Sequence, residues 1–204
     1  TTLLRRILMA GDEVHIPPEN WHLGPTMLRF RQRRWGLEWE EIVRLAATRF
    51  ANQGRHAGGS VNRWFDTDAL PPIIEELSQY PVDERSLARL VDGLYRQHGR
   101  KQGSTFERWG DKTPLNVNWM PEIQKVFPEA RFIHLLRDGT DVIHSWMNLE
   151  KYSDIRDPAS RWKDAVRTAR DFEKKHPSLC LEVRYEELVE ESKVTVEEIC
   201  NFLD

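Results

Sequence analysis

One stretch in the second half of the chain constrains the fold more than any other. Four apolar residues lie in the segment 131–136, which is followed by Arg137, a turn and a helical pattern that carries Ser145. A short apolar run of this kind is typical of a parallel-sheet strand that is covered on both faces. An arginine at the carboxyl end of such a strand, with a hydroxyl on the next helix, is well placed to hold a phosphate group. The alternative is that Arg137 forms an ion pair with Asp138 or Asp141 and that the serine is an ordinary helix residue.

The length and the charge balance set broad limits on fold and partners. A chain of 204 residues can form one domain with its own core, and we expect a single domain over residues 1–204. The 30 basic and 33 acidic side chains nearly balance, so the composition requires neither a nucleic acid nor an anionic membrane as partner. No apolar run approaches the roughly 20 residues of a membrane-spanning helix. We expect a cytoplasmic, bacterial protein; the Golgi lumen is the alternative if an upstream anchor has been removed.

Hydrophobic periodicity predicts helices with a few strands between them. Helices are expected over residues 1–9, 39–50, 69–80, 83–98, 140–149 and 159–175, and after 185. Strands are expected over 131–136 and 179–185, a strand end at 108–111, and loops over 14–25 and 54–62, the second of them mobile. In the helix over 39–50, the side chains expected to face the core are Ile42, Val43, Leu45, Ala46 and Phe50. Strands separated by helices favour an α/β fold with a parallel sheet. Because few strands are visible, we expect the first strand to lie upstream of Thr1.

The two cysteines and the spacing of possible ligands give no sign of a metal or a disulfide. Cys180 and Cys200 fit neither a metal-binding spacing nor a disulfide framework, and both lie in apolar contexts. We therefore expect two buried thiols in a reducing compartment. No cluster of histidine, aspartate or glutamate residues has metal-ligand spacing, and the sequence predicts no metal site.

Four groups of residues each place a polar or charged side chain beside a strand end or a helix start. They are Thr1 with Thr2, Lys112 within Asp-Lys-Thr-Pro, Arg137 with Ser145, and Tyr185 within Arg-Tyr-Glu-Glu-Leu. The two threonines form a predicted anion site, because the amino terminus of a helix offers free N–H groups and the positive end of the helix dipole. Each group alone is weak, since serine and threonine cap helices in many proteins.

The order of these four groups resembles the sulfotransferase family that uses 3′-phosphoadenosine 5′-phosphosulfate (PAPS). In that family a P-loop-like turn, Pro-Arg-Ser-Gly-Thr-Thr, holds the 5′-phosphosulfate, and the segment 1–4 looks like the last part of it. Arg137 and Ser145, eight residues apart, match the pair that binds the 3′-phosphate, and Tyr185 matches a tyrosine near the adenine. The Asp-Lys-Thr-Pro segment resembles one found in the bacterial and protein-tyrosine branches. The resemblance spans residues 1–203.

The resemblance implies a fold and a reaction. The fold would be the three-layer α/β fold of P-loop-containing nucleoside-triphosphate hydrolases, with a central parallel sheet that is incomplete at both ends here. The reaction would move the sulfuryl group from PAPS to an acceptor hydroxyl without a metal and leave 3′-phosphoadenosine 5′-phosphate. The acceptor would be a small molecule, a sugar or a tyrosyl peptide, and the segment 29–72 is expected to shape its pocket. No oligomeric state is implied.

Two residues are candidates for the chemical step. Lys112 would contact the transferring sulfonate or the bridging oxygen as charge builds there; the alternative is a lysine that enters a helix and pairs with Asp111. The family keeps its general base in the loop that corresponds to residues 15–22. We favour Glu19, because neighbouring prolines and a tryptophan would hold it rigid and partly desolvated, which raises the affinity of a carboxylate for a proton. His15 and His22 are the competing candidates.

Two other functions compete with a sulfotransferase. The first is a small-molecule kinase that uses ATP on the same broad fold, which would need a Gly-Lys-Ser/Thr loop and a magnesium-binding aspartate after an apolar strand. Asp138 could serve as that aspartate. The second is a non-catalytic relative that binds the nucleotide but has lost turnover. The set formed by Lys112, Arg137, Ser145 and Tyr185 favours retained nucleotide binding.

Overall fold

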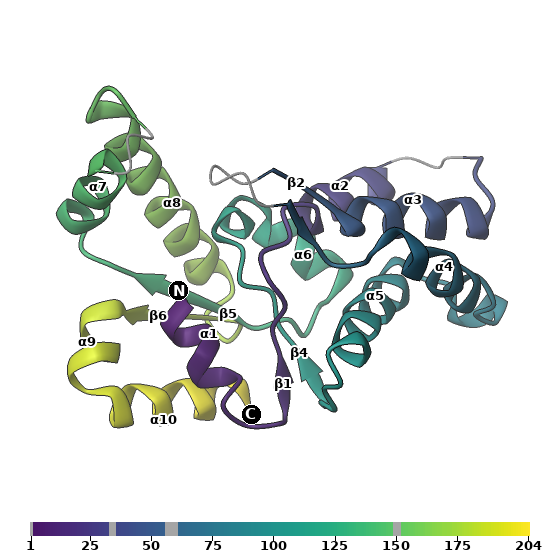
Figure 1. Cartoon of the computed structure of the whole chain (residues 1–204). Helices are drawn as coiled ribbons and strands as arrows, with labels where there is room; N and C mark the ends of the chain where they lie inside the picture. Colours follow the sequence, from purple (N-terminus) through teal and green to yellow (C-terminus); the bar gives the residue numbers. More distant parts are fainter. Residues whose placement is uncertain (1, 33–35, 56–60, 149–151) are drawn as a thin grey trace. The chain divides into compact units, whose positions relative to one another are not determined.

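The computed structural model describes residues 2–32, 36–55, 61–148 and 152–204 (Figure 1). The chain divides into two compact units, residues 1–126 and 127–204. The first unit contains α1 (Thr2–Leu8), β1 (Val14–His15), α2 (Leu23–Gln32), α3 (Trp39–Ala51), β2 (Asn52–Arg55), β3 (Val61–Arg63), α4 (Leu70–Ser78), α5 (Leu87–Lys101), β4 (Arg108–Trp109) and α6 (Met120–Val126). Three short 3₁₀ helices complete it, at Thr67–Ala69, Val82–Glu84 and Pro114–Trp119. The second contains β5 (Phe132–Leu136), α7 (Gly139–Asn148), α8 (Arg156–Lys175), β6 (Cys180–Arg184), α9 (Tyr185–Glu190) and α10 (Ser192–Leu203).

The core of the first unit is built by α3, α4 and α5 around an aromatic cluster. The Trp64 ring packs edge-on against Tyr95 at a centroid distance of 4.8 Å and against Phe50 at 5.7 Å, and all three side chains are buried. Such edge-to-face pairs add stabilisation beyond the burial of their area. The cluster fixes α5 against the segment that precedes α4, and α5 carries one end of the site described below.

The buried face of α3 differs from the predicted face, most clearly at Leu45. Val43, Ala46 and Phe50 are buried as expected, but Leu45 is 42% exposed. In a helix each residue turns by about 100°, so Leu45 lies about 200° around the axis from Val43. Ala47 is buried in its place, since it continues the i, i+4 stripe from Val43.

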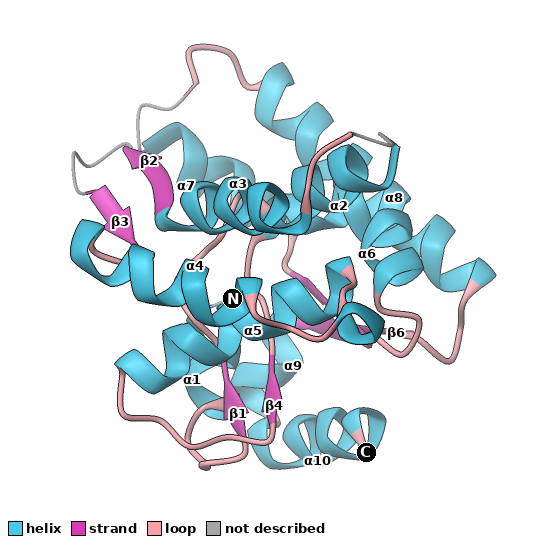
Figure 2. Ribbon diagram, turned by 90° about the vertical axis from the view of Figure 1, so that its right-hand side faces the viewer, coloured by secondary structure: helices cyan, strands magenta, loops and turns pink. Residues whose placement is uncertain are grey.

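Two short strands bring distant segments together in the first unit. β1 and β4 are parallel, with Val14 opposite Arg108 and His15 opposite Trp109 (Figure 2). The Gly110 amide continues the pairing and donates to the His15 carbonyl at 2.9 Å. Because parallel strands end at the same edge of a sheet, the loop after β1 and the segment after β4 leave side by side. These are the two segments in which Glu19 and Lys112 were predicted to act.

The prediction of a loop over residues 54–62 is wrong at both ends of this segment. β2 and β3 form an antiparallel pair there, with Asn52 opposite Arg63 and Arg55 opposite Val61. Backbone pairing requires no alternating apolar pattern when the strands are short, which is why periodicity missed it. Residues 56–60 lie outside the described residues. The loop expected over 14–25 is likewise interrupted, by β1 and by the start of α2.

The second unit contains the predicted parallel strand pair. β5 and β6 run parallel in register from Phe132 opposite Cys180 to Leu136 opposite Arg184, and they are joined by a crossover through α7 and α8 (Figure 1). The Phe132 ring packs edge-on against Phe172 of α8 at 5.0 Å. The expected cover on both faces of β5 is only partial, since Leu136 is buried and the other four residues of the strand are half-buried.

The two cysteines differ in burial. Cys180 is buried in β6, and burial with the negative charges of Glu173 and Glu182 raises the pKa of its thiol to about 11. Cys200 is exposed, so the expectation of two buried thiols is wrong for this residue. It follows Ile199, which faces the core, and the next residue of a helix points about 100° away.

The sequence predicted neither a membrane-spanning helix nor a metal site. In the described part of the chain, no helix is both long and apolar enough to cross a membrane. Within the same residues, no group of three or more histidine, cysteine, aspartate or glutamate side chains is arranged to hold a metal ion.

Candidate functional site

The two predicted catalytic side chains are in direct contact. The Lys112 ammonium donates a hydrogen bond to Glu19 Oε1 across 93 residues of sequence. Both side chains are partly shielded from water, with 20% of Lys112 and 28% of Glu19 exposed. The alternative pairing of Lys112 with Asp111 is not the one observed. The Glu19–Lys112 pair lies where the chain leaves the ends of β1 and β4.

The loop that carries Glu19 is held by side chains from other elements. Arg5 donates to the Ile16 carbonyl at 2.7 Å, and the Trp64 indole donates to the Pro18 carbonyl at 3.1 Å. The Asn20 amide donates to Thr113 Oγ1 at 2.8 Å, so a second contact joins the two segments directly beside the Glu19–Lys112 pair. These bonds replace the regular backbone ladder that the loop lacks, and they limit the positions of Glu19.

The residue before Lys112 in the chain, Asp111, carries a partly buried carboxylate. Asp111 accepts hydrogen bonds from the Tyr95 hydroxyl at 2.7 Å and from Asn116 Nδ2 at 2.6 Å. Burial raises the pKa of the Asp111 carboxyl to about 6, and repulsion from Glu19 adds to the rise, while hydrogen bonds oppose it. The sequence interpretation considered Asp111 only as a partner of Lys112. Its actual partners come from α5 and from the 3₁₀ helix at 114–119, which no spacing indicates.

The two histidines that competed with Glu19 have other partners. His15 is buried, its Nε2 lies 2.9 Å from His98 Nδ1, and its ring stacks on Phe106. His22 Nε2 lies 2.9 Å from the Asn52 carbonyl, and burial lowers the pKa of this imidazole. Both rings therefore make contacts that stabilise the fold, and Glu19 is the candidate that contacts Lys112.

The second unit brings together two of the residues predicted to bind nucleotide. Arg137 follows β5, Tyr185 follows β6, and the Arg137 guanidinium carbon lies 5.2 Å from the centroid of the Tyr185 ring. Arg137 also forms an ion pair with Asp141 at 3.0 Å, as the alternative interpretation expected. This pair is exposed on both sides, with 43% and 57% of the side chains accessible. The Trp162 indole donates to the Arg137 carbonyl at 3.2 Å and so holds the backbone at this point.

The turn between β5 and α7 is organised by Asp138. Its carboxylate accepts from the Thr140 amide at 2.8 Å and the Asp141 amide at 3.2 Å, which caps the start of α7 and lowers the pKa of Asp138. Its own amide donates to Glu186 of α9 at 2.9 Å. Asp138 therefore serves as a helix cap, which differs from the magnesium-binding role that a kinase would require.

The remaining predicted residues lie on helices. Ser145 is exposed on α7, about two turns after its start, and Thr2 is exposed at the start of α1. Thr1 lies outside the described residues. Thr2, Glu19 and Lys112 belong to the first unit, whereas Arg137 belongs to the second together with Ser145 and Tyr185.

The fold and the residue pattern define a class of protein. Among solved structures, the sulfotransferase domain from the Synechococcus PCC 7002 olefin synthase matches with a TM-score of 0.63 at 21% identity, over 99% of this chain and 68% of that chain. This likeness confirms the expected P-loop-like α/β fold. Residues 1–204 match the model of the sulfotransferase family, and the chain belongs to that family.

Two curated relatives are named as protein-tyrosine sulfotransferases. One from Caenorhabditis briggsae is 30% identical over 210 residues, which cover all of this chain and 61% of the relative. One from Drosophila melanogaster is 28% identical over 162 residues, which cover 68% of this chain and 32% of the relative. The chain thus spans less than two thirds of the length of these relatives.

Proposed function

We propose that this protein transfers a sulfuryl group from PAPS to an acceptor hydroxyl. The observation that carries the proposal is the hydrogen bond between Glu19 and Lys112, which joins a general-base candidate to the charge that the transfer needs. Membership of the sulfotransferase family supports the reaction class. When bound, the donor supplies an activated sulfonate and a stable leaving group, 3′-phosphoadenosine 5′-phosphate. The protein supplies positioning, a base and positive charge.

Glu19 is the proposed base. A carboxylate has two oxygens that can each accept hydrogen bonds, and Lys112 donates to Oε1. Oε2 lies 3.5 Å from the Trp21 indole nitrogen, which is a long and weak contact. We assign to Oε2 the task of accepting the acceptor's proton as the acceptor oxygen attacks sulfur. The neighbouring bonds of Pro18 and Asn20 keep the carboxylate in place for this step.

Lys112 is the proposed source of positive charge. An ammonium group carries three N–H donors, and one of them is directed at Glu19. The other two can meet sulfonate or leaving-group oxygens as negative charge develops on them. Since Lys112 supplies this charge, we propose that the transfer needs no metal ion, and the assay below includes EDTA to test it.

Arg137 and Tyr185 are the proposed contacts for the 3′-phosphoadenosine part of the donor. An exposed ion pair is worth about 0–1 kcal/mol, so the bond of Arg137 to Asp141 is easily exchanged for a phosphate with nearly two negative charges. Tyr185 offers an aromatic face that can also pack on the adenine. Ser145 is proposed to donate to the same phosphate, and Thr1 and Thr2 to the 5′ side.

We propose a tyrosyl peptide as the acceptor to test first, because the curated relatives carry the name protein-tyrosine sulfotransferase. The experiment incubates the full chain with ³⁵S-labelled PAPS, with and without EDTA, and offers tyrosine-containing peptides, phenols and sugars. In parallel, thermal unfolding is compared in the presence of 3′-phosphoadenosine 5′-phosphate and of Mg·ATP. We expect label on a hydroxyl acceptor and stronger stabilisation by 3′-phosphoadenosine 5′-phosphate. Preferential stabilisation by Mg·ATP, with no sulfuryl transfer, would contradict the proposal and favour a kinase.

A further inference from the structure

The segment that carries Lys112 has almost no backbone structure of its own. Residues 110–113 lie between the end of β4 and the 3₁₀ helix that starts at Pro114, and they belong to neither helix nor strand. The Gly110 amide donates to the His15 carbonyl, and the Asn116 amide donates to the Thr113 carbonyl. The course of the chain at Lys112 therefore depends on side-chain bonds to either side of it.

Asp111 and Thr113 provide those bonds on the two sides of Lys112. Thr113 is tied to Asn20 in the loop of Glu19. Asp111 is tied to two places at once: Oδ2 accepts from Tyr95 on α5 and Oδ1 accepts from Asn116 on the 3₁₀ helix. Tyr95 is itself immobilised, since its ring is fully buried and stacks on Trp109 at a centroid distance of 3.8 Å. A short chain segment anchored at both neighbours can place its central side chain in few positions.

We infer that Asp111 is a positioning residue of the transfer reaction, which acts by tying the backbone beside Lys112 to Tyr95 of α5. The inference rests on the proposed function, because it assigns a task within that reaction. We assign Asp111 no contact with substrate, since its two oxygens accept from Tyr95 and Asn116. Its effect reaches the reaction through Lys112, which in turn contacts Glu19.

The chemistry of the site shows why a carboxylate is required at this position. Two donors, a phenol and a carboxamide, converge on the two oxygens of one side chain. An asparagine would set its own NH₂ group against one of these donors, and a buried donor without an acceptor is costly. Burial and the nearby negative charge of Glu19 both disfavour the ionised form of Asp111. The protein keeps an electrostatically unfavourable carboxyl here, which a purely apolar anchor would avoid.

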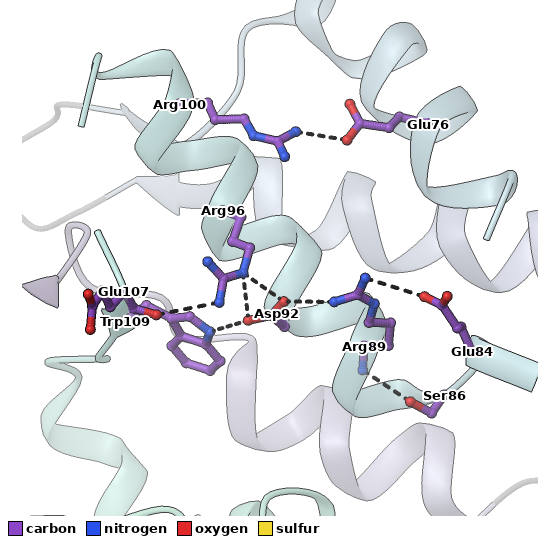
Figure 3. Close-up of polar contacts among 9 residues, drawn as sticks. All are labelled: Glu76, Glu84, Ser86, Arg89, Asp92, Arg96, Arg100, Glu107 and Trp109. Carbon is purple, nitrogen blue, oxygen red and sulfur yellow. Dashed lines mark hydrogen bonds and ion pairs between the residues drawn. The ribbon is translucent and has the colours of Figure 1, made fainter. Parts of the chain in front are cut away.

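Two variants and a matched control test this inference. Asp111→Asn removes the double acceptor, and Tyr95→Phe removes one hydroxyl while keeping the buried ring. Asp92→Asn is the control, because Asp92 is a carboxylate on α5 that likewise accepts hydrogen bonds, from the Trp109 indole at 3.0 Å and from Arg96 at 2.9 Å (Figure 3). It ties α5 to β4, two residues before Asp111, and makes no bond to the segment 110–113.

The kinetic test measures kcat and KM for PAPS in the full chain, alone and in a Lys112→Ala background. We expect Asp111→Asn to lower kcat about 10- to 100-fold and Tyr95→Phe less, because a small misplacement of a catalytic group has effects of this size. In the Lys112→Ala background the same substitutions should lower kcat less than about threefold, since the effects of residues that act as a unit are not additive. If Asp111→Asn and Tyr95→Phe lower kcat by the same factors in the Lys112→Ala background as in the wild type, their role is merely structural and the inference is overturned. Asp92→Asn should lower stability and leave kcat within about threefold in both backgrounds.

A second measurement does not require turnover. Hydrogen–deuterium exchange of the ligand-free protein should be faster in the peptide covering 111–113 for Asp111→Asn and Tyr95→Phe, and unchanged there for Asp92→Asn. Unchanged exchange in both test variants would overturn the inference, whatever the activity. Failure of the wild-type protein to transfer label from PAPS to any acceptor would instead overturn the proposed function. The two failures are therefore distinguishable.

Discussion

The guanidinium of Arg137 lies over the ring of Tyr185, with 5.2 Å between the guanidinium carbon and the ring centroid. The two residues follow the parallel strands β5 and β6, whose last paired residues are Leu136 and Arg184. An arginine held over an aromatic face can still make hydrogen bonds in the guanidinium plane, as Arg137 does with Asp141. The contact therefore preorganises the group that we propose for the 3′-phosphate.

Arg137→Ala is expected to weaken the binding of 3′-phosphoadenosine 5′-phosphate about 10- to 100-fold, because hydrogen bonds to a charged group contribute about 1.5–3 kcal/mol. Arg137→Lys should recover only part of the loss, since an ammonium lacks the planar fork. Isothermal titration calorimetry measures the affinity. The matched control is Arg161→Ala, because Arg161 also lies over a tyrosine, 5.9 Å from the Tyr152 centroid, and bonds to its hydroxyl. Equal weakening by both alanine variants would contradict the assignment.

Glu19→Gln is expected to lower kcat about 10²- to 10⁴-fold, because the amide cannot take a proton from the acceptor hydroxyl. Steady-state transfer of ³⁵S from PAPS measures the effect, and the affinity for 3′-phosphoadenosine 5′-phosphate should change little. Glu122→Gln serves as control, since Glu122 forms another glutamate–lysine pair in the same unit, with Lys125 at 3.1 Å. A Glu19→Gln protein with the wild-type kcat would show that another group is the base.

The buried His15–His98 pair predicts a loss of stability in acid. Burial, followed by the positive charges of its neighbours, lowers the pKa of His98 from 6.5 to about 4. Between these two pH values, His98 is protonated in the unfolded chain and neutral in the folded chain. The free energy of unfolding therefore falls as the pH drops from about 6.5 to about 4. The loss amounts to roughly 3 kcal/mol from this group.

Urea unfolding at several pH values measures this loss. Between pH 6.5 and pH 4, the free energy of unfolding should change less with pH in His98→Gln than in the wild type. His144→Gln, at an exposed residue of α7, should follow the wild type. Identical slopes for His98→Gln and the wild type would show that other groups govern acid unfolding.

Gly24→Ala is expected to destabilise the first unit by about 1–3 kcal/mol, because overpacking costs this much. A Cβ at Gly24 would collide with the stem of the Trp119 side chain, and α2 would have to shift from the 3₁₀ helix that follows the Lys112 segment. Gly11→Ala is the control, since a Cβ there meets no atom within 4 Å. Thermal unfolding followed by circular dichroism compares them. Similar unfolding midpoints for the two variants would mean that the Trp119 side chain can move aside without a loss of stability.

Long periodic elements and short chemical motifs were predictable from the sequence. The stripes of α3, α5 and α8 predicted helices close to their observed bounds, and the apolar runs at 131–136 and 179–185 predicted the parallel pair β5 and β6. The contact between Glu19 and Lys112 agrees with the role that each residue was expected to play, although that role stays a proposal.

Other features depend on tertiary contacts that no local pattern carries. α2 was missed because Gly24 and Pro25 resemble a loop, yet proline in the first turn of a helix loses no hydrogen bond. The bond from Tyr95 to Asp111 joins α5 to the segment after β4, and Tyr95 on its own is an ordinary core residue of an amphipathic helix. Such pairings are set by the packing of the whole unit.

The parallel pairing of β1 with β4 has a consequence for the order of folding. The pairing holds together two segments that are 93 residues apart at Glu19 and Lys112, whereas α3, α4 and α5 all lie in the stretch between these two residues. Closing a long loop costs entropy that only the intervening core can offset. During refolding, the aromatic cluster around Trp64 should therefore form before Glu19 meets Lys112. We therefore expect the Glu19–Lys112 contact to form late, so that its formation reports completion of the first unit rather than its collapse.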